Sequence, residues 1–336
     1  MTGRLGPRQL VVGHLLVGPP QHGVVRFAED ALAALDTPGP VVRVRSVSEL
    51  GPRWADPLIG CDLVHLQYTD QLYARRCEDA AATFVRLVDE LGVRCSVTLH
   101  DLPQPGDGAS LLGRRAGCYR CVVGAVAGVV VSSHHESALL DALGPPRRRR
   151  VVVPLPVEPH TVVAPPAGDG QVTVLGFLHP GKGHDDALDA MATLPPEVGL
   201  VALGRPATGH EDLPAALRTR AAGRRVRVTG FLDDLTPHLR TAGVPLAPNR
   251  SVSASGSVGT WLTAGRRPLV PAGRYADELL ARCLGALWTY APGELTDTLT
   301  LALAEPARTW LGPEVVLGPS RAAAAHAHLA AWARFA

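Results

Sequence analysis

Lysine is almost absent from this sequence. Of the 33 basic residues in the 336-residue chain, only Lys182 is a lysine, and every other one is arginine. Arginine carries a rigid planar fork of donors, whereas lysine carries a compact ammonium on a flexible stem. A single lysine kept against this bias indicates either a position that needs a compact cation or a leftover residue on a solvated turn. On spacing alone the two alternatives have equal weight.

Aromatic residues and net charge are also scarce. Aromatic side chains make up 4% of the chain, and the formal net charge is +2. Nucleic-acid-binding proteins use basic patches and aromatic platforms on which bases stack, so the sequence does not indicate a nucleic-acid partner. A hydrophobic content of 46% instead indicates a globular protein, long enough for two domains with a core each.

Disulfide frameworks, zinc sites and membrane spans find no support either. Six cysteines are few for this length, and Cys118 with Cys121 forms a lone CxxC without the second pair of a zinc site. Free thiols in a reducing cytosol are the expectation. The longest apolar run, residues 122–131, is too short to cross a membrane, and residues 10–17 lack a signal-peptide pattern. We therefore expect a soluble cytoplasmic protein without a metal site.

Short apolar runs alternate with helical patterns along most of the chain. The predicted strands cover residues 10–16, 41–44, 63–67, 95–99, 129–131, 151–153, 172–175, 199–203, 225–229, 244–247 and 268–270. The predicted helices cover residues 24–35, 77–91, 135–143, 185–191, 213–221, 235–242, 257–264 and 320–336. This order of strand and helix is typical of α/β proteins in which helices cover both faces of a parallel sheet.

A break in the alternation indicates two domains. Residues 154–170 contain five prolines and two glycines and therefore predict an interdomain linker. We expect two doubly wound, Rossmann-like domains that face a cleft, one covering residues 1–158 and the other residues 171–318. Residues 319–336 are expected to form a helix that packs back on the N-terminal domain.

In doubly wound sheets ligands bind outside the carboxyl ends of the strands, so the loops after the strands are the candidate sites. Gly23, in the loop after the first strand, could let backbone approach a phosphate closely, although a plain tight turn is as good an explanation. His100 and Asp101 follow a strand directly, which makes His100 the best candidate for a general base or a substrate-orienting group. The alternative is a polar pair that caps backbone groups. His65 is a further candidate, but a lone strand histidine is more often a core residue.

Two loops of the second half could bind an anion. Lys182 lies between a predicted strand and a predicted helix, where helix N-termini favour phosphate. Ser255, Gly256 and Ser257 open another helix with small residues that leave backbone N–H groups accessible, although an ordinary helix cap explains them equally well. The arginine run at residues 147–150 is either a solvated cluster, which is favoured, or a contact with anionic lipid.

Taken together and in this order, these segments resemble a retaining family of glycosyltransferases with the GT-B fold. It is the glycosyltransferase family 4-like group that includes phosphatidylinositol mannosyltransferases. Residues 176–183, Gly-Phe-Leu-His-Pro-Gly-Lys-Gly, resemble its Gly-Arg-Leu-x-x-x-Lys-Gly signature. The similarity covers most of the chain and is also carried by Gly23, by His100 after Val-Thr-Leu, and by residues 151–157, 226–234 and 263–270.

The resemblance implies a metal-independent transfer of a hexose from a nucleotide-diphosphate sugar, UDP- or GDP-linked, to a hydroxyl acceptor, with no other cofactor. It implies that His100 and Asp101 act on the transferred sugar, and that His65 and Tyr68 lie on the acceptor side. The donor-binding residues that it implies, with Arg250 as a substitute cation, are Gly23, Lys182, Arg250, Ser255, Gly256, Ser257 and Thr260.

The chain departs from the family at three positions. Phe177 stands where the signature has arginine, and the family's Glu-x7-Glu pair falls on Val252 and Thr260. An alternative is therefore a non-catalytic relative that serves as a sugar-nucleotide-binding or partner subunit. A peripheral contact with the inner face of a membrane is a further alternative, and the sequence predicts neither the oligomeric state nor the acceptor.

Overall fold

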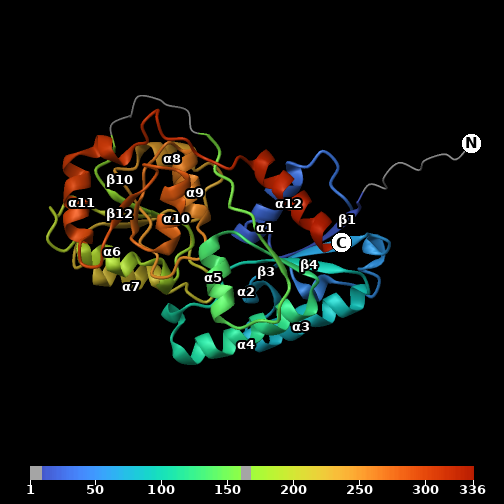
Figure 1. The fold of residues 1–336 in the computed structure, drawn as a ribbon. Coiled ribbons are helices and arrows are strands. Elements are labelled where there is room, and N and C mark those ends of the chain that lie inside the picture. The colour runs from blue at the N-terminus through green and yellow to red at the C-terminus, as the bar shows by residue number, and fades with distance from the viewer. Residues whose placement is uncertain (1–9, 160–167) are drawn as a thin grey trace, which may run out of the picture. The chain divides into compact units, whose positions relative to one another are not determined.

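The computed structural model describes residues 10–159 and 168–336, and the chain divides into two compact units (Figure 1). The first unit comprises the chain up to Leu155 together with Arg321–Ala336, so that it contains both the N-terminal half and the last helix. The second unit is Pro156–Ser320. Their roles as acceptor-side and donor-binding domains stay predictions.

The first unit is built on a six-stranded parallel sheet with the strand order β2-β1-β3-β4-β5-β6. The strands are β1 (Val12–Val17), β2 (Val41–Val44), β3 (Leu63–Tyr68), β4 (Cys95–Leu99), β5 (Gly128–Val131) and β6 (Arg149–Val152). Every residue of β1, β3, β4 and β5 is buried. Such strands are apolar on both sides because helices cover both faces of the sheet.

Helices α1 and α12 lie on one face of this sheet, and α3 and α4 lie side by side on the other (Figure 1). The helices of the first unit are α1 (Gly23–Ala33), α2 (Asp70–Tyr73), α3 (Cys77–Leu91), α4 (Ala109–Ala125), α5 (His134–Ala142) and α12 (Arg321–Phe335). The alanine-rich α12 approaches the sheet closely. A Cβ atom on Gly128 of β5 would lie 2.2 Å from the ring of Phe335, so this helix and the glycine fit together.

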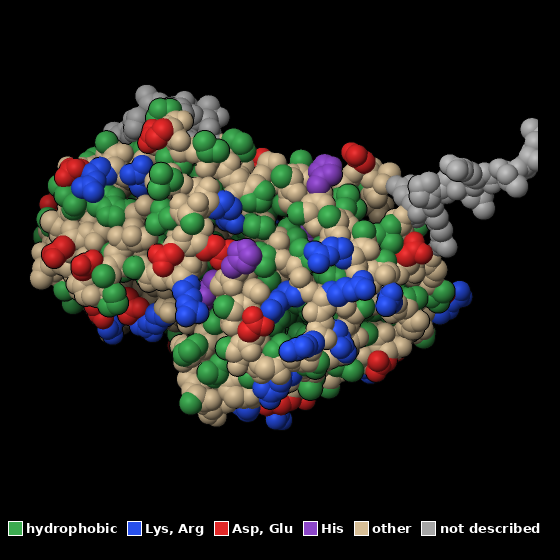
Figure 2. Space-filling model, viewed as in Figure 1, with side chains coloured by type: hydrophobic (Ala, Val, Ile, Leu, Met, Phe, Trp, Pro, Cys, Tyr) green, Lys and Arg blue, Asp and Glu red, His purple; other side chains and the backbone are tan. Residues whose placement is uncertain are grey.

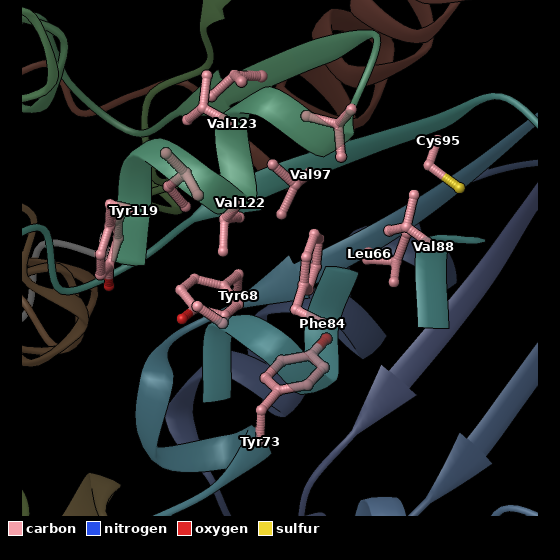
Figure 3. Packing of buried hydrophobic residues seen from close by; sticks show 14 of the residues in the cluster. Leu66, Tyr68, Tyr73, Phe84, Val88, Cys95, Val97, Tyr119, Val122 and Val123 are labelled. Carbon is pink, nitrogen blue, oxygen red and sulfur yellow. The ribbon is translucent and has the colours of Figure 1, made fainter. Parts of the chain in front are cut away.

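An aromatic cluster forms the core between the sheet and helices α3 and α4 (Figure 3). The ring of Tyr68 meets those of Phe84 and Tyr119 edge to face, with centroids 5.1 and 5.3 Å apart. Tyr73 packs on the rings of Tyr68 and Phe84 and donates a hydrogen bond to the carbonyl oxygen of Gln67. Burial of each large side chain contributes about 1.5–3 kcal/mol, so this cluster fixes β3, and with it the loop that follows, against α3 and α4.

The second unit has a six-stranded parallel sheet with the order β12-β11-β10-β7-β8-β9. Its strands are β7 (Val172–Leu175), β8 (Leu200–Leu203), β9 (Val226–Val228), β10 (Val244–Leu246), β11 (Leu269–Pro271) and β12 (Trp288–Tyr290). Its helices are α6 (His184–Ala190), α7 (Leu213–Arg220), α8 (Thr236–Thr241), α9 (Gly256–Thr263), α10 (Arg274–Arg282) and α11 (Leu295–Ala304). The predicted α/β class with two doubly wound parallel sheets is confirmed.

Several elements were not predicted from the sequence. Helix α4 contains Gly113, Gly117 and Gly124, and glycine lowers helix propensity by about 1 kcal/mol per residue. Packing of Tyr119, Val122 and their neighbours against α3 overrides this low propensity. The short elements α2 and β12 were also missed, because their apolar segments are too brief to give a clear period. Helices α10 and α11 were missed as well.

A buried arginine, Arg266, connects two backbone segments of the second unit. Arg266 is fully buried, and its guanidinium donates hydrogen bonds to the carbonyl oxygens of Leu239, Ala242 and Gly243 and to both oxygens of Thr309. Its guanidinium carbon lies 4.4 Å from the ring centroid of Trp310. Burial lowers the pKa of Arg266 to about 10. The arginine therefore satisfies carbonyl groups that would otherwise lack partners.

We expect Arg266→Met to destabilise the protein by about 3 kcal/mol or more, because buried carbonyl oxygens lose their donors. The matched control is Arg282→Met, which removes an exposed arginine from the last turn of α10. Urea unfolding followed by tryptophan fluorescence measures both variants. Equal unfolding midpoints for the two variants would contradict the role given to Arg266.

Candidate functional site

The two sheet orders locate the positions at which ligands of doubly wound proteins bind. Ligands of such proteins bind outside the carboxyl ends of the strands, at the point where the strand order reverses. In the first unit the reversal lies between β1 and β3, and in the second unit it lies between β7 and β10. The loops after these strands are therefore the candidate site of each unit.

In the second unit the loops after β7 and β10 pack directly against each other. Gly183 has a φ of +77°, and a Cβ atom on it would lie 2.1 Å from the carbonyl oxygen of Pro248. The backbone N–H of Arg250 donates a hydrogen bond to the carbonyl oxygen of Gly181, at 3.1 Å. Only glycine fits at position 183, and this contact brings the loop that carries Lys182 against the loop after β10.

Lys182 is a buried cation in this region. Its side chain is 5% exposed, and its ammonium donates a hydrogen bond to the Oγ of Ser257 at 3.0 Å. Gly176 leaves room for it, since a Cβ atom there would lie 3.0 Å from the Nζ. Within residues 10–159 and 168–336 no carboxylate forms an ion pair with Lys182. Burial lowers the pKa of its ammonium to about 8, so the amine is mostly protonated at neutral pH.

The hydroxyl that meets Lys182 belongs to the N-terminus of helix α9. Ser255 is the N-cap, and its Oγ accepts a hydrogen bond from the N–H of Val258 and lies 3.1 Å from the Oγ of Ser257. Gly256 is exposed, and a Cβ atom there would meet nothing within 4 Å. A helix N-terminus carries partial positive charge and unpaired N–H donors. Together with the ammonium it forms a site that can bind an anion.

Two further residues predicted to bind the donor have partners of their own. The guanidinium of Arg250 pairs with the carboxylates of Asp185 and Asp186, at 2.6 and 2.7 Å. These two negative charges compensate its charge, which opposes the predicted role as a substitute phosphate cation. The Oγ1 of Thr260 donates to the carbonyl oxygen of Gly256 within α9, at 2.9 Å. Neither role is tested, and both stay predictions.

In the first unit, Gly23 begins helix α1 after β1. It is exposed, its φ is not positive, and a Cβ atom on it would meet nothing within 4 Å. Neither the turn nor the packing therefore requires glycine at this position. The preceding residue, His22, caps the helix, because its Nδ1 accepts a hydrogen bond from the N–H of Val24 at 3.2 Å.

His100 lies at the carboxyl end of β4 and is half-buried. Its Nε2 donates to the Oε1 of Gln67 at 2.8 Å, and its ring packs edge-on against Phe27. Burial lowers the pKa of His100 to about 4, against the opposing effect of the Asp101 carboxylate, and His22 lowers it further. His100 is therefore neutral near pH 7, with Nδ1 as its acceptor nitrogen.

Asp101 is held in an uncommon backbone conformation next to His100. Its φ is +50°, a left-handed value that costs a non-glycine residue of order 1–3 kcal/mol. Its carbonyl oxygen accepts hydrogen bonds from Arg115 and Tyr119, at 2.7 and 3.2 Å. Arg115 also pairs with Asp70 of α2 and with Asp107, which lies in the same loop as Asp101. The loop is therefore rigidly held, while the Asp101 side chain is exposed.

The two residues predicted for the acceptor side lie in the core. His65 is 1% exposed, and its ring nitrogens meet the hydroxyl groups of Ser96 and Thr98. Tyr68 is fully buried in the aromatic cluster. The burial of both side chains favours the core alternative named for His65 and opposes the acceptor-side role expected of Tyr68, which stays a prediction. The physical reason is that all six residues of β3 are buried between helices.

Two residues of the first-unit site were not singled out from the sequence. Burial lowers the pKa of His22 against the opposing effect of the Asp101 carboxylate, and His22 in turn lowers the pKa of His100. Gln67 fixes the orientation of the His100 ring. Gln67 lies in β3, and a fully buried strand has no alternation of buried and exposed positions that could mark Gln67 as a site residue. His22 could have been found from its position, because it directly precedes a helix that follows a strand.

On the face drawn in Figure 2, arginine side chains gather over the first unit with few aspartates and glutamates between them, whereas both signs are mixed over the second unit. In the run at residues 147–150, Arg148 donates to the carbonyl oxygens of Gly124 and Val126, and Arg150 pairs with Asp141. These contacts favour a structural role over lipid binding. In the described part of the chain, no helix is long and apolar enough to cross a membrane, and no metal-binding group of three side chains is found.

No protein-family model and no curated protein matches the chain. Solved structures do match. The chain is similar to Anabaena Alr3699/HepE, crystallised with UDP, at 16% identity and a TM-score of 0.63, with 97% of this chain and 96% of that chain covered. It is similar to sucrose-phosphate synthase (tll1590) from Thermosynechococcus elongatus at 14% identity and a TM-score of 0.66, with 97% and 95% covered.

A glycosyltransferase from Rickettsia africae ESF-5 is similar at 12% identity and a TM-score of 0.60, with 96% and 94% covered. At such identities the likeness establishes the fold. The chain has the GT-B fold of these glycosyltransferases, as the sequence resemblance implied, with two Rossmann-like domains. Membership of the retaining family 4-like group stays a prediction.

We expect Lys182→Met to stabilise the free protein by about 1–3 kcal/mol at pH 7, because it removes a charge that burial disfavours. The pKa of Lys182 is about 8 in the folded protein and 10.5 in the unfolded chain. The gain should therefore be complete below pH 8 and shrink as the pH rises towards 10.5. Thermal unfolding of both proteins across this range, in a buffer without phosphate, measures it. A variant less stable than wild type at pH 7 would contradict the account.

Proposed function

We propose that the protein is a glycosyltransferase that moves a hexose from a nucleoside-diphosphate sugar to a hydroxyl acceptor, with retention of configuration. The observation that carries the proposal is the buried Lys182 ammonium beside the N-terminus of α9, with no carboxylate among the described residues to neutralise it. A buried cation without a negatively charged partner destabilises the folded protein. A bound diphosphate would supply the missing negative charge.

The chemistry of sugar transfer matches this site. When the bond between the sugar and the diphosphate breaks, negative charge develops on the leaving phosphate oxygen. Lys182, the Oγ of Ser257 and the N–H groups at the start of α9 would bind that oxygen and stabilise its charge. The proposal therefore assigns the neutralisation to protein groups and to no metal ion. The leaving phosphate can then accept the proton of the acceptor hydroxyl.

His100 would position the transferred sugar. Its neutral ring, held by Gln67, offers Nδ1 as a hydrogen-bond acceptor for a sugar hydroxyl. Asp101, in its left-handed conformation, would present its exposed carboxylate beside the same group. The solved HepE structure with UDP-glucose supports a UDP-linked donor, while a GDP-linked donor is the alternative.

A non-catalytic sugar-nucleotide-binding relative is the second candidate. It is favoured by Val252, which stands where the resembled family has a glutamate beside the transferred sugar and which carries no charge. Both candidates predict binding of a nucleoside diphosphate, but only the transferase predicts turnover. Release of UDP or GDP from a panel of nucleotide sugars, with water as the acceptor, separates them.

We expect His100→Gln to bind UDP or GDP with the affinity of wild type but to release it from the donor sugar about 100-fold more slowly, because the sugar loses its positioning. Calorimetric titration measures the binding, and the release assay measures the turnover. Equal turnover in both proteins would refute the role of His100. If no nucleoside diphosphate binds wild type at millimolar concentration, the proposed function itself fails.

A further inference from the structure

The charge of a diphosphate exceeds what Lys182 alone can neutralise. A diphosphate group carries at least two negative charges near neutral pH, and Lys182 contributes one positive charge. Arg250 is already paired with two carboxylates. Position 177, five residues before Lys182, is a phenylalanine. The second unit therefore needs another cation near the Lys182 loop if it binds such a group.

The loop after β8 lies directly beside the loop of Lys182. A Cβ atom on Gly204 would lie 2.1 Å from the carbonyl oxygen of Gly176, so the two backbones touch at this point. The N–H of Leu178 donates to the carbonyl oxygen of Arg205, at 2.9 Å. Gly176 also borders the ammonium of Lys182. Arg205 and Lys182 thus both adjoin the same short segment, residues 176–178.

The side chain of Arg205 lies over an aromatic ring. Its guanidinium carbon lies 5.4 Å from the centroid of the Phe177 ring, and the residue is exposed. Among the described residues, no carboxylate pairs with it. A guanidinium that stacks on an aromatic face keeps its N–H donors directed outward in its own plane. These donors match the two oxygens of a phosphate group.

We propose that Arg205, held over the ring of Phe177, is the second cation that binds the diphosphate of the donor beside Lys182. The inference rests on the proposed function, since it assumes that the second unit binds a nucleoside diphosphate. Phe177 acts as a positioning residue. It stands where the signature of the resembled family has arginine, and it contacts a cation supplied by the loop after β8.

Calorimetric titration of UDP and GDP against four variants, at Arg205, Phe177, Arg218 and Lys182, tests this inference. We expect Arg205→Gln to weaken binding of the better nucleotide about 10-fold or more, as loss of a charge-assisted hydrogen bond does. We expect Phe177→Leu to weaken it less, because the guanidinium keeps its charge but loses its orientation. Arg218→Gln removes an exposed arginine from α7 of the same unit and is the matched control.

The salt dependence gives a readout that a structural role would not change. The decrease of affinity with rising salt concentration should be shallower for Arg205→Gln than for Arg218→Gln, because one ionic contact is missing. Unchanged thermal midpoints of the free variants show that they are folded.

The result that overturns the inference is wild-type affinity in Arg205→Gln while Lys182→Met loses binding, which leaves the proposed function intact. An equal loss in Arg205→Gln and Arg218→Gln overturns it as well. Failure of wild type to bind UDP and GDP rejects the proposed function and the inference with it.

Discussion

The candidate site of the second unit depends on one buried ammonium. Lys182 donates to a single hydroxyl, that of Ser257, although an ammonium has three N–H donors. Burial without a carboxylate partner lowers its pKa and costs stability. Groups whose environment opposes their charge concentrate at functional sites. The cost is offset when an anion binds, and the N-terminus of α9 makes the same position favourable for that anion.

The backbone around Lys182 is built so that this charge meets the helix. Gly183 lets the loop after β7 touch Pro248 in the loop after β10, and Gly176 leaves space for the ammonium. A Cβ atom on Gly183 or on Gly176 would block the respective contact. The geometry follows from the strand order, because β7 and β10 are neighbours at the switch point of the sheet. The fold therefore brings together two loops that are about seventy residues apart in the sequence, as the hydrogen bond between Lys182 and Ser257 shows.

The sequence predicted the fold class and much of the second-unit site, and the structure explains where it failed. Buried parallel strands such as β4 and β7 give continuous apolar runs, and their bounds agree with the predicted ones. Helix α4 was missed because tertiary packing and not local propensity stabilises it. The resemblance assigned Lys182 and Ser257 to the same donor site, but their direct hydrogen bond was not predicted, because no local pattern encodes it. For Arg250 and Tyr68 the sequence could not reveal the neighbouring carboxylates and the aromatic core.

Because Lys182 is the only lysine of the chain, its ammonium can be observed alone. Protein labelled with carbon-13 lysine gives one set of side-chain signals, whose pH titration by nuclear magnetic resonance reports the pKa of this residue. The account predicts a pKa near 8 in the free protein, and a clear rise when UDP or GDP is added, because a bound phosphate favours the charged form. A pKa near 10.5 in the free protein, or no change with either nucleotide, would contradict it.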